Sequence, residues 1–243
     1  MCIRDSLYWL LFLPLLLACN GDIDLQPTVS NPDPPETIDT TELPKKLSYL
    51  ALGDSYTIGH GVPSEENFPN QLATRLTANG DTIQPIKIIA QTGWTSFRLQ
   101  VEINNATDPD SVYDIVTLLI GVNDQYQGQP IAQYPSSFET LLEKAIQFAG
   151  GRKERVFVVS IPDYAFTGFG GGDPDISIEI DEYNAINKRI AEEMEVTYFD
   201  ITPISRKGLD EPELVASDRL HPSGEQYRRW VDLMFPVVLE RLQ

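Results

Sequence analysis

The chain has 243 residues, 42% of them hydrophobic, and its 36 acidic residues outnumber its 18 basic ones, which gives a formal net charge of −18. This composition is typical of a globular protein, and the length is sufficient for one main domain with a substantial core. Nucleic acid is not an expected partner, because binding a phosphate backbone requires clustered Lys and Arg, and the same charge disfavours direct docking on anionic lipid headgroups.

Residues 7–18 form an apolar segment of signal-peptide length, shorter than the about 20 residues that a membrane-spanning helix needs. The segment ends in Leu-Leu-Ala followed by Cys19, which resembles the cleavage and lipidation site of bacterial lipoproteins. We expect residues 1–18 to be a lipoprotein signal peptide and Cys19 to carry the lipid, so that the protein lies in the bacterial cell envelope, periplasmic or surface-exposed. The alternative is an ordinary secretory signal that contains a cysteine.

Residues 1–6 lack the clear positive charge of a signal peptide and resemble a translated sequencing adapter, so we interpret them as an artefact. Residues 19–46 are rich in proline and acidic side chains without apolar periodicity, which is typical of a solvated, extended tether. The domain that follows, residues 47–243, contains neither of the two cysteines. We therefore expect no disulfide and no thiol nucleophile in it.

From residue 47 onward, short apolar runs alternate with longer amphipathic stretches. The pattern predicts strands at residues 47–52, 86–90, 113–121, 155–161 and 196–200, and helices at residues 67–79, 95–104, 134–149, 178–195 and 223–242. This alternation predicts an α/β fold with a mainly parallel sheet covered by helices on both faces. Folds of this kind bind ligands beyond the carboxyl ends of the strands, so the residues after each strand are the candidates for chemistry.

The first predicted strand is followed by GDSYTIG, residues 53–59. Its glycines allow a sharp turn that would present the Ser55 hydroxyl as a nucleophile beside free backbone N–H groups. Helix capping by Asp54 or Ser55 is the alternative. Thr57 stands where a G-x-S-x-G nucleophile elbow has its second glycine, so the usual α/β-hydrolase fold is not indicated.

Gly93 follows the second predicted strand, and Asn123 lies in the sequence GVND after the third. The backbone N–H of Gly93 and the side-chain amide of Asn123 can both reach a negative charge that develops near Ser55. For Asn123 and Asp124, local turn chemistry is the alternative.

The sequence SDRLHPSG, residues 217–224, precedes the last predicted helix. Asp218 lies three residues before His221, so its carboxylate can accept the Nδ1 proton and orient Nε2 as a base, although capping of the helix by Ser223 alone is an alternative. His60 is the rival base, and we expect it on a helix that leads away from Ser55. Two histidines without other soft ligands do not predict a zinc site of the usual kind.

Together, the blocks GDSYTIG, the Gly93 loop, GVND and DRLHPSG resemble those of the SGNH, or GDSL, hydrolase family over residues 47–243. The resemblance implies a three-layer α/β/α sandwich with a flavodoxin-like, five-stranded parallel sheet. It also implies that Ser55 is the nucleophile, His221 the general base and Asp218 the orienting acid, with an oxyanion hole formed by the N–H groups of Ser55 and Gly93 and the amide of Asn123. It implies no metal and no cofactor.

We therefore expect a serine hydrolase that cleaves carboxylic esters of short to medium acyl chains through an acyl-enzyme, as an esterase or lysophospholipase-like enzyme. The alternatives are a carbohydrate O-acetylesterase acting on polysaccharide, and a non-catalytic binding module on the same fold. The expected partners are a small-molecule or glycan ester, with membrane contact only through the N-terminal lipid, and we expect a monomer. The residues that we expect to contact substrate, with packing under loops as the alternative, are Trp94, Asp124, Tyr126 and Tyr164.

Overall fold

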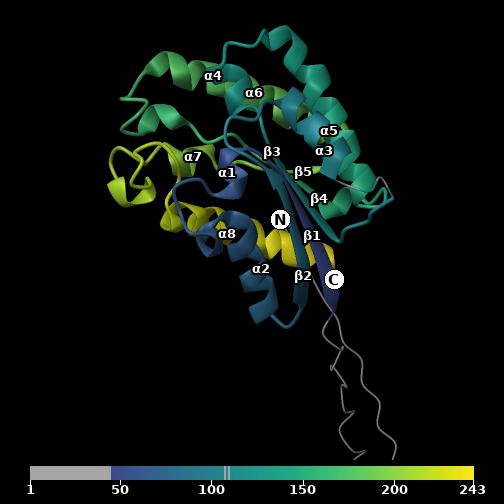
Figure 1. The fold of residues 1–243 in the computed structure, drawn as a ribbon. Helices are drawn as coiled ribbons and strands as arrows, with labels where there is room; N and C mark the ends of the chain where they lie inside the picture. Colours follow the sequence, from purple (N-terminus) through teal and green to yellow (C-terminus); the bar gives the residue numbers. More distant parts are fainter. Residues whose placement is uncertain (1–44, 107, 109) are drawn as a thin grey trace, which may run out of the picture. The chain divides into compact units, whose positions relative to one another are not determined.

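The computed structural model describes residues 45–106, 108 and 110–243, so the predicted signal peptide, Cys19 and nearly all of the predicted tether lie outside the described residues. A parallel sheet of five strands in the order β2-β1-β3-β4-β5 forms the centre of the domain (Figure 1). The strands are β1 (Lys46–Gly53), β2 (Thr82–Ala90), β3 (Ile115–Leu119), β4 (Val156–Val159) and β5 (Thr197–Phe199). The predicted α/β class and five-stranded parallel sheet are confirmed.

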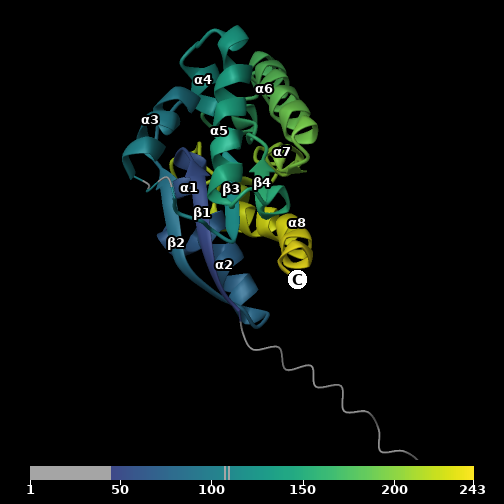
Figure 2. The ribbon, with the colours of Figure 1, turned by 90° about the vertical axis from the view of Figure 1, so that its right-hand side faces the viewer.

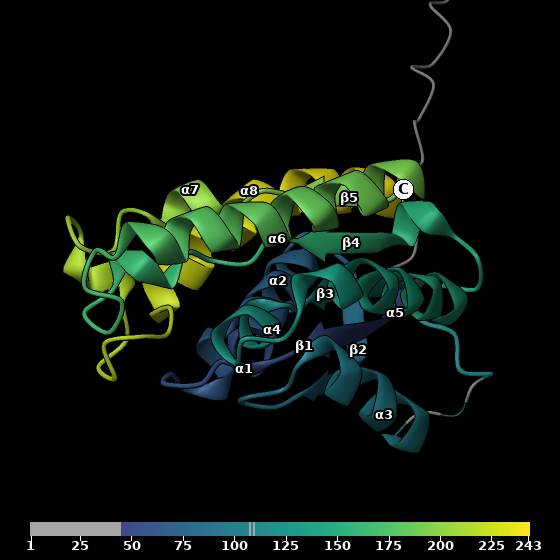
Figure 3. The same cartoon turned by 90° about the horizontal axis from the view of Figure 1, so that it is seen from above.

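Helices cover both faces of this sheet (Figures 1 and 2). On one face α2 (Phe68–Ala78) packs against α8 (Gly224–Leu242), and on the other α5 (Tyr134–Phe148) packs against α3 (Ser96–Ala106) and α6 (Pro174–Glu193). The short helices α1 (Ser55–Ile58), α4 (Val122–Tyr126) and α7 (Thr202–Ser205) follow β1, β3 and β5, and α1 and α4 lie together at the carboxyl end of the sheet (Figure 3). Single 3₁₀ turns occur at Ser64–Glu66, Ile131–Gln133, Lys153–Arg155, Tyr164–Phe166 and Pro212–Leu214.

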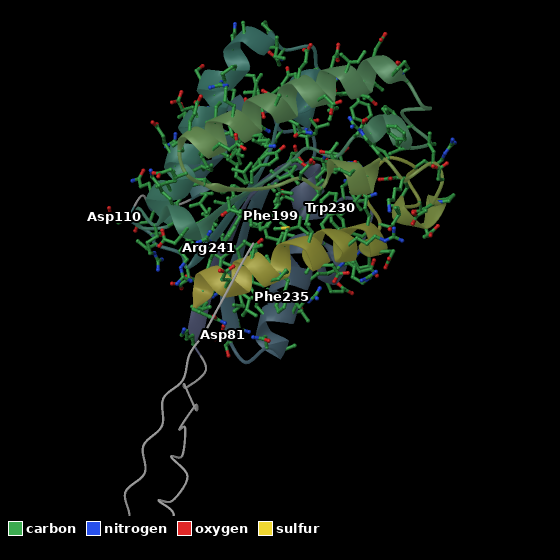
Figure 4. The ribbon with its side chains drawn as sticks, turned by 180° about the vertical axis from the view of Figure 1, so that it is seen from behind. Asp81, Asp110, Phe199, Trp230, Phe235 and Arg241 are labelled. Carbon is green, nitrogen blue, oxygen red and sulfur yellow. The ribbon has the colours of Figure 1, made fainter. Side chains whose placement is uncertain are left out.

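The core lies between the sheet and its two helical layers. Every residue of β3 and β4 is buried, as expected for parallel strands covered on both faces. Between the sheet and α8, the ring of Trp230 meets that of Tyr227 edge-on, with centroids 4.9 Å apart, and Phe68 of α2 packs against both (Figure 4 labels Trp230). Among the described residues, no helix combines the length and apolar character needed to cross a bilayer.

Two element boundaries differ from the sequence prediction for identifiable reasons. Strand β2 begins at Thr82 rather than at residue 86, because Pro85 interrupts the donor pattern but is tolerated on an edge strand where the register with β1 shifts. Helix α6 begins at Pro174 rather than at residue 178. Its cap is Asp173, whose carboxylate accepts a hydrogen bond from the Asp175 N–H at 3.0 Å, and proline suits the first helical turn.

Candidate active site

The turn between β1 and α1 places Ser55 at the carboxyl end of the sheet. Gly53 passes so close to Leu119 of β3 that a Cβ atom there would collide with the Leu119 carbonyl oxygen and with the Thr57 side chain. Only glycine therefore fits this position. Asp54 then caps α1 by accepting the Tyr56 N–H at 3.0 Å, and Ser55, which is buried, begins the helix where backbone N–H groups lack helical partners.

Asp54 itself is fully buried. Its Oδ1 accepts the Tyr56 N–H, whereas its Oδ2 has no hydrogen-bond partner among the residues that the structure describes. Burial therefore raises the pKa of the Asp54 carboxyl from its ordinary value of 3.8 to about 8, and the nearby Asp124 carboxylate acts in the same direction. At neutral pH the residue that precedes Ser55 is therefore uncharged.

The loop before α8 pairs Asp218 with His221, as their spacing predicts. The Nδ1 atom of His221 lies 2.7 Å from Oδ2 of Asp218, while Oδ1 accepts the backbone N–H groups of Leu220 at 2.9 Å and His221 at 3.0 Å. Three bonds thus fix this carboxylate relative to the imidazole, which is 6% exposed. Ser223 also caps α8 by accepting the Gln226 N–H at 3.2 Å, so the capping and the Asp218–His221 pair occur together.

The electrostatics of this pair favour a neutral imidazole beside a charged carboxylate. Burial lowers the pKa of His221 below its ordinary value, against the opposing effect of Asp218, and His60 lowers it further. For Asp218, burial acts to raise the pKa, but the hydrogen bonds from the His221 and Leu220 backbone and from the imidazole outweigh it, so the pKa is lowered. At neutral pH His221 is therefore ready to accept a proton at its free ring nitrogen.

His60 does not lie where the sequence analysis placed it. Helix α1 has only four residues, because Gly59 adopts the left-handed conformation with φ of 81° and ends it. The chain turns back, and the ring centroid of His60 lies 4.6 Å from that of His221. The exposed His60 also places its Nδ1 atom 3.0 Å from Oγ1 of Thr92. The expectation of a helix leading away from Ser55 is wrong.

Ser55 and His221 open onto a single pocket of about 280 Å³, and Gly93 and Asn123 line the same pocket. Segments after β1, β2 and β3 and the loop before α8 thus converge at one edge of the sheet, as the parallel topology requires. The amide Nδ2 of Asn123 donates to the Trp94 carbonyl at 3.0 Å with one of its two N–H groups, which leaves the other for a ligand.

The loop that carries Gly93 has a second attachment, to the residue that directly follows α4. The Gln127 Nε2 atom donates to the Gly93 carbonyl at 3.0 Å. This bond holds the peptide plane between Gly93 and Trp94 in one orientation. Two bonds, one from Asn123 in α4 and one from Gln127 directly after it, thus set the geometry of the Gly93 segment.

Two of the four residues expected to contact substrate line this pocket. Tyr126 and Tyr164 do so, and with Phe169 they form an aromatic group in which the three pairs of ring centroids lie 6.1–6.3 Å apart. Phe169 was not predicted, because it lies in the glycine-rich stretch 168–172, where the sequence offers no periodicity. The one signal in the sequence that could have indicated Phe169 as a pocket residue is its position as an aromatic residue among glycines after β4.

Trp94 and Asp124 do not line the pocket. Trp94 is half-buried against the hydrophobic core. Asp124 is buried, and its carboxylate accepts the backbone N–H of Ser96 at 2.8 Å and the Ser96 hydroxyl at 2.6 Å, which secures the start of α3. Asp124 also lines a neighbouring pocket, which shares Gln127 with the first, and its contact with substrate stays a prediction.

The sequence profile of the GDSL-like Lipase/Acylhydrolase family matches residues 51–229, a range that contains the turn of Ser55, the Gly93 and Asn123 segments and the Asp218–His221 loop. The chain belongs to this family. Among curated proteins, none matches the chain by sequence.

Solved structures of GDSL-like hydrolases and related enzymes share the fold. A lipase from a goat rumen metagenome has a TM-score of 0.66 and 19% identity, with 81% of this chain and 100% of that chain covered. A lipase/acylhydrolase from Enterococcus faecalis has a TM-score of 0.64 and 19% identity, with 81% and 97% covered. An acetyl xylan esterase from Geobacillus stearothermophilus has a TM-score of 0.58 and 19% identity, with 82% and 96% covered.

Proposed function

We propose that this family member hydrolyses carboxylic esters of short to medium acyl chains through a Ser55 acyl-enzyme. The observation that carries the proposal is the 2.7 Å pair of His221 Nδ1 and Asp218 Oδ2, placed so that His221 and Ser55 share one pocket. Membership of an acylhydrolase family supports the same class of reaction.

In this mechanism the Ser55 hydroxyl attacks the ester carbonyl while His221 Nε2 accepts its proton. Asp218 keeps the imidazole in the required tautomer and stabilises the imidazolium. The N–H groups of Ser55 and Gly93 and the second amide N–H of Asn123 stabilise the oxyanion. His221 then protonates the leaving alcohol, and a water molecule repeats the sequence on the acyl-enzyme.

The preference for short to medium acyl groups rests on the pocket. Its volume of about 280 Å³ is small for a ligand site, and the rings of Tyr126, Tyr164 and Phe169 bound it on one side. A series of nitrophenyl esters from C2 to C16 on purified protein tests this: C2 to C6 esters should be cleaved faster than C12 to C16 esters. The reverse order would contradict it.

The role of Ser55 is tested by a serine-directed fluorophosphonate probe. We expect the probe to label the wild type and not Ser55→Ala. Labelling of neither protein would favour the non-catalytic alternative, and equal labelling of both would assign the nucleophile elsewhere. Circular dichroism of Ser55→Ala provides the folding control.

A second candidate activity, deacetylation of carbohydrate, is favoured by a neighbouring polar pocket. This pocket of about 250 Å³ shares Gln127 with the first and is lined by amides and hydroxyls, including Gln129, Gln133 and Ser137, beside the 69% exposed ring of Phe97. Amide and hydroxyl side chains beside an aromatic face suit a neutral sugar. Acetate release from acetylated xylan, compared with nitrophenyl acetate hydrolysis, separates the two activities: faster release from xylan would support the carbohydrate enzyme.

We propose in addition that Cys19 is lipidated and anchors the enzyme in the bacterial envelope. The support is the Leu-Leu-Ala-Cys sequence at the end of an apolar segment of signal-peptide length. Labelling with a palmitate analogue in a bacterial host tests it: wild type should be labelled and found in the membrane fraction, and Cys19→Ser should not be labelled.

A further inference from the structure

The two histidines of the chain form a feature that ester hydrolysis does not require. His60 and His221 come from different loops, yet their ring centroids are 4.6 Å apart with the planes inclined at 48°. One ligand atom each of His60, His221 and Asp218 lies within 4.8 Å of the others. Within the described residues, this is the one group of three histidine or carboxylate side chains with such spacing.

Each imidazole has a hydrogen-bond partner at its Nδ1 atom. Asp218 Oδ2 lies 2.7 Å from Nδ1 of His221, and Thr92 Oγ1 lies 3.0 Å from Nδ1 of His60. Both partners can accept a proton from Nδ1, and in that tautomer Nε2 carries the lone pair of each ring. Metal-binding histidines are held in a similar way, by an oxygen acceptor on the second ring nitrogen, commonly a carboxylate, which also raises the basicity of the ligand.

We propose that His60 and His221 bind Zn²⁺ and that the bound ion inhibits the enzyme by occupying the catalytic base. Zn²⁺ binds imidazole nitrogen at about 2.0–2.1 Å, so two such ligands lie roughly 3.3–3.5 Å apart on a tetrahedral ion. The side chain of His60 is exposed and can rotate to reach this geometry, while Asp218 remains hydrogen bonded to His221. Water completes the coordination.

The surroundings favour a cation at this position. His60 and Asp218 are exposed, so an ion arrives directly from solvent. The net charge of −18 attracts cations to the protein. A Zn²⁺ ion on Nε2 of His221 uses the lone pair that would take the Ser55 proton, so hydrolysis stops without any change in the fold. The inhibitory effect, though not the binding, rests on the proposed function.

Inhibition is measured with enzyme treated with a chelator, dialysed and assayed on nitrophenyl acetate over a ZnCl₂ titration. We expect inhibition by Zn²⁺ that a chelator reverses, and no inhibition by MgCl₂, since Mg²⁺ prefers oxygen ligands. For each variant the activity with Zn²⁺ is divided by its own activity without it, so that differences in basal rate cancel. In His60→Gln the Zn²⁺ concentration for half-inhibition should rise by about 10-fold or more.

A matched control removes an exposed ligand that the site does not use. Glu65→Gln eliminates an exposed carboxylate on a nearby turn and should keep the Zn²⁺ sensitivity of the wild type. Equal sensitivity of His60→Gln and wild type would overturn the proposal. His60→Asn serves as the second variant if His60→Gln melts at a lower temperature than the wild type.

Direct binding separates this proposal from the proposed function. Isothermal titration of Zn²⁺ into Ser55→Ala, which lacks the nucleophile but keeps both histidines, should show one site, and the Ser55→Ala/His60→Gln double variant should bind at least about 10-fold more weakly. Binding without any esterase activity in the wild type would contradict only the proposed function. Equal binding by the single and double variants would contradict the zinc site.

Discussion

The hydroxyl of Tyr227 donates a hydrogen bond of 2.9 Å to the backbone carbonyl of Tyr56, the residue that follows Ser55. Both residues are buried, and they lie 171 positions apart in the sequence. The bond joins α8 to the helix that carries the proposed nucleophile. The loop of Asp218 and His221 leads directly into α8, so this contact links the two parts of the proposed triad through the backbone.

Tyr227→Phe removes this bond and leaves the Tyr56 carbonyl buried without its partner. We expect a loss of about 1–3 kcal/mol in the free energy of unfolding, the cost of an unsatisfied buried acceptor. Urea denaturation followed by circular dichroism measures it. The control is Tyr126→Phe, whose ring is 59% exposed and which should unfold at nearly the wild-type urea concentration. Equal stability of both variants would mean that solvent reaches the Tyr56 carbonyl.

Asn123→Ala should lower kcat by about 10²–10³, the loss that follows removal of one oxyanion donor. The same change removes the 3.0 Å bond to the Trp94 carbonyl, so the thermal midpoint is measured in parallel. The exposed Asn105→Ala on α3 serves as the matched control with wild-type kcat. A wild-type kcat for Asn123→Ala would exclude its amide from the oxyanion hole.

Asp54 should make the stability of the protein depend on pH. Its pKa in the folded protein is about 8 against an ordinary value of 3.8, so between these values the folded chain holds a proton that the unfolded chain releases. The contribution of Asp54 to the free energy of unfolding is fully present below pH 3.8. It falls as the pH rises and is lost above about pH 8.

Asp54→Asn is uncharged at every pH and should abolish that part of the decline. The free energy of unfolding, measured with urea at pH 5 and at pH 8, should fall less in the variant than in the wild type. An equal fall in both would show that water reaches the Asp54 carboxylate.

Arg206→Met should destabilise the segment that contains Tyr164, one of the three aromatic residues that line the pocket. Arg206 Nε lies 2.9 Å from Oδ2 of Asp163, a fully buried carboxylate whose Oδ1 accepts the Ala165 N–H at 3.0 Å and so caps the turn that contains Tyr164. Loss of the arginine leaves this charge unpaired, and we expect about 2–3 kcal/mol of destabilisation, somewhat below the cost for a fully buried pair because Arg206 is partly exposed.

The measurement is urea denaturation, with KM for a C6 ester as a second readout of the Tyr164 position. The exposed ion pair of Arg189 and Glu193 offers the control, since Arg189→Met should cost less than about 1 kcal/mol. A cost for Arg206→Met no larger than for Arg189→Met would contradict the role of the buried pair.

Sequence patterns predicted the strands and long helices within a few residues, because burial on two faces and amphipathic periodicity are local signals. The pairing of Asp218 with His221 was also predictable from their spacing of three residues. The positions of His60 and Asp124 were not. A left-handed Gly59 reverses the chain before His60, and the partner of Asp124 is Ser96, 28 residues away. Such long-range partners leave no periodic trace in the sequence.

The order in which the chain supplies its site has a consequence for biosynthesis. Ser55 follows the first strand, but Asp218 and His221 follow the fifth, after the sheet is complete. A nascent or truncated polypeptide that ends before residue 218 can contain all five strands and Ser55, yet it lacks the proposed base, His221. Under the proposed mechanism, ester hydrolysis therefore requires the last segment of the chain to be synthesised.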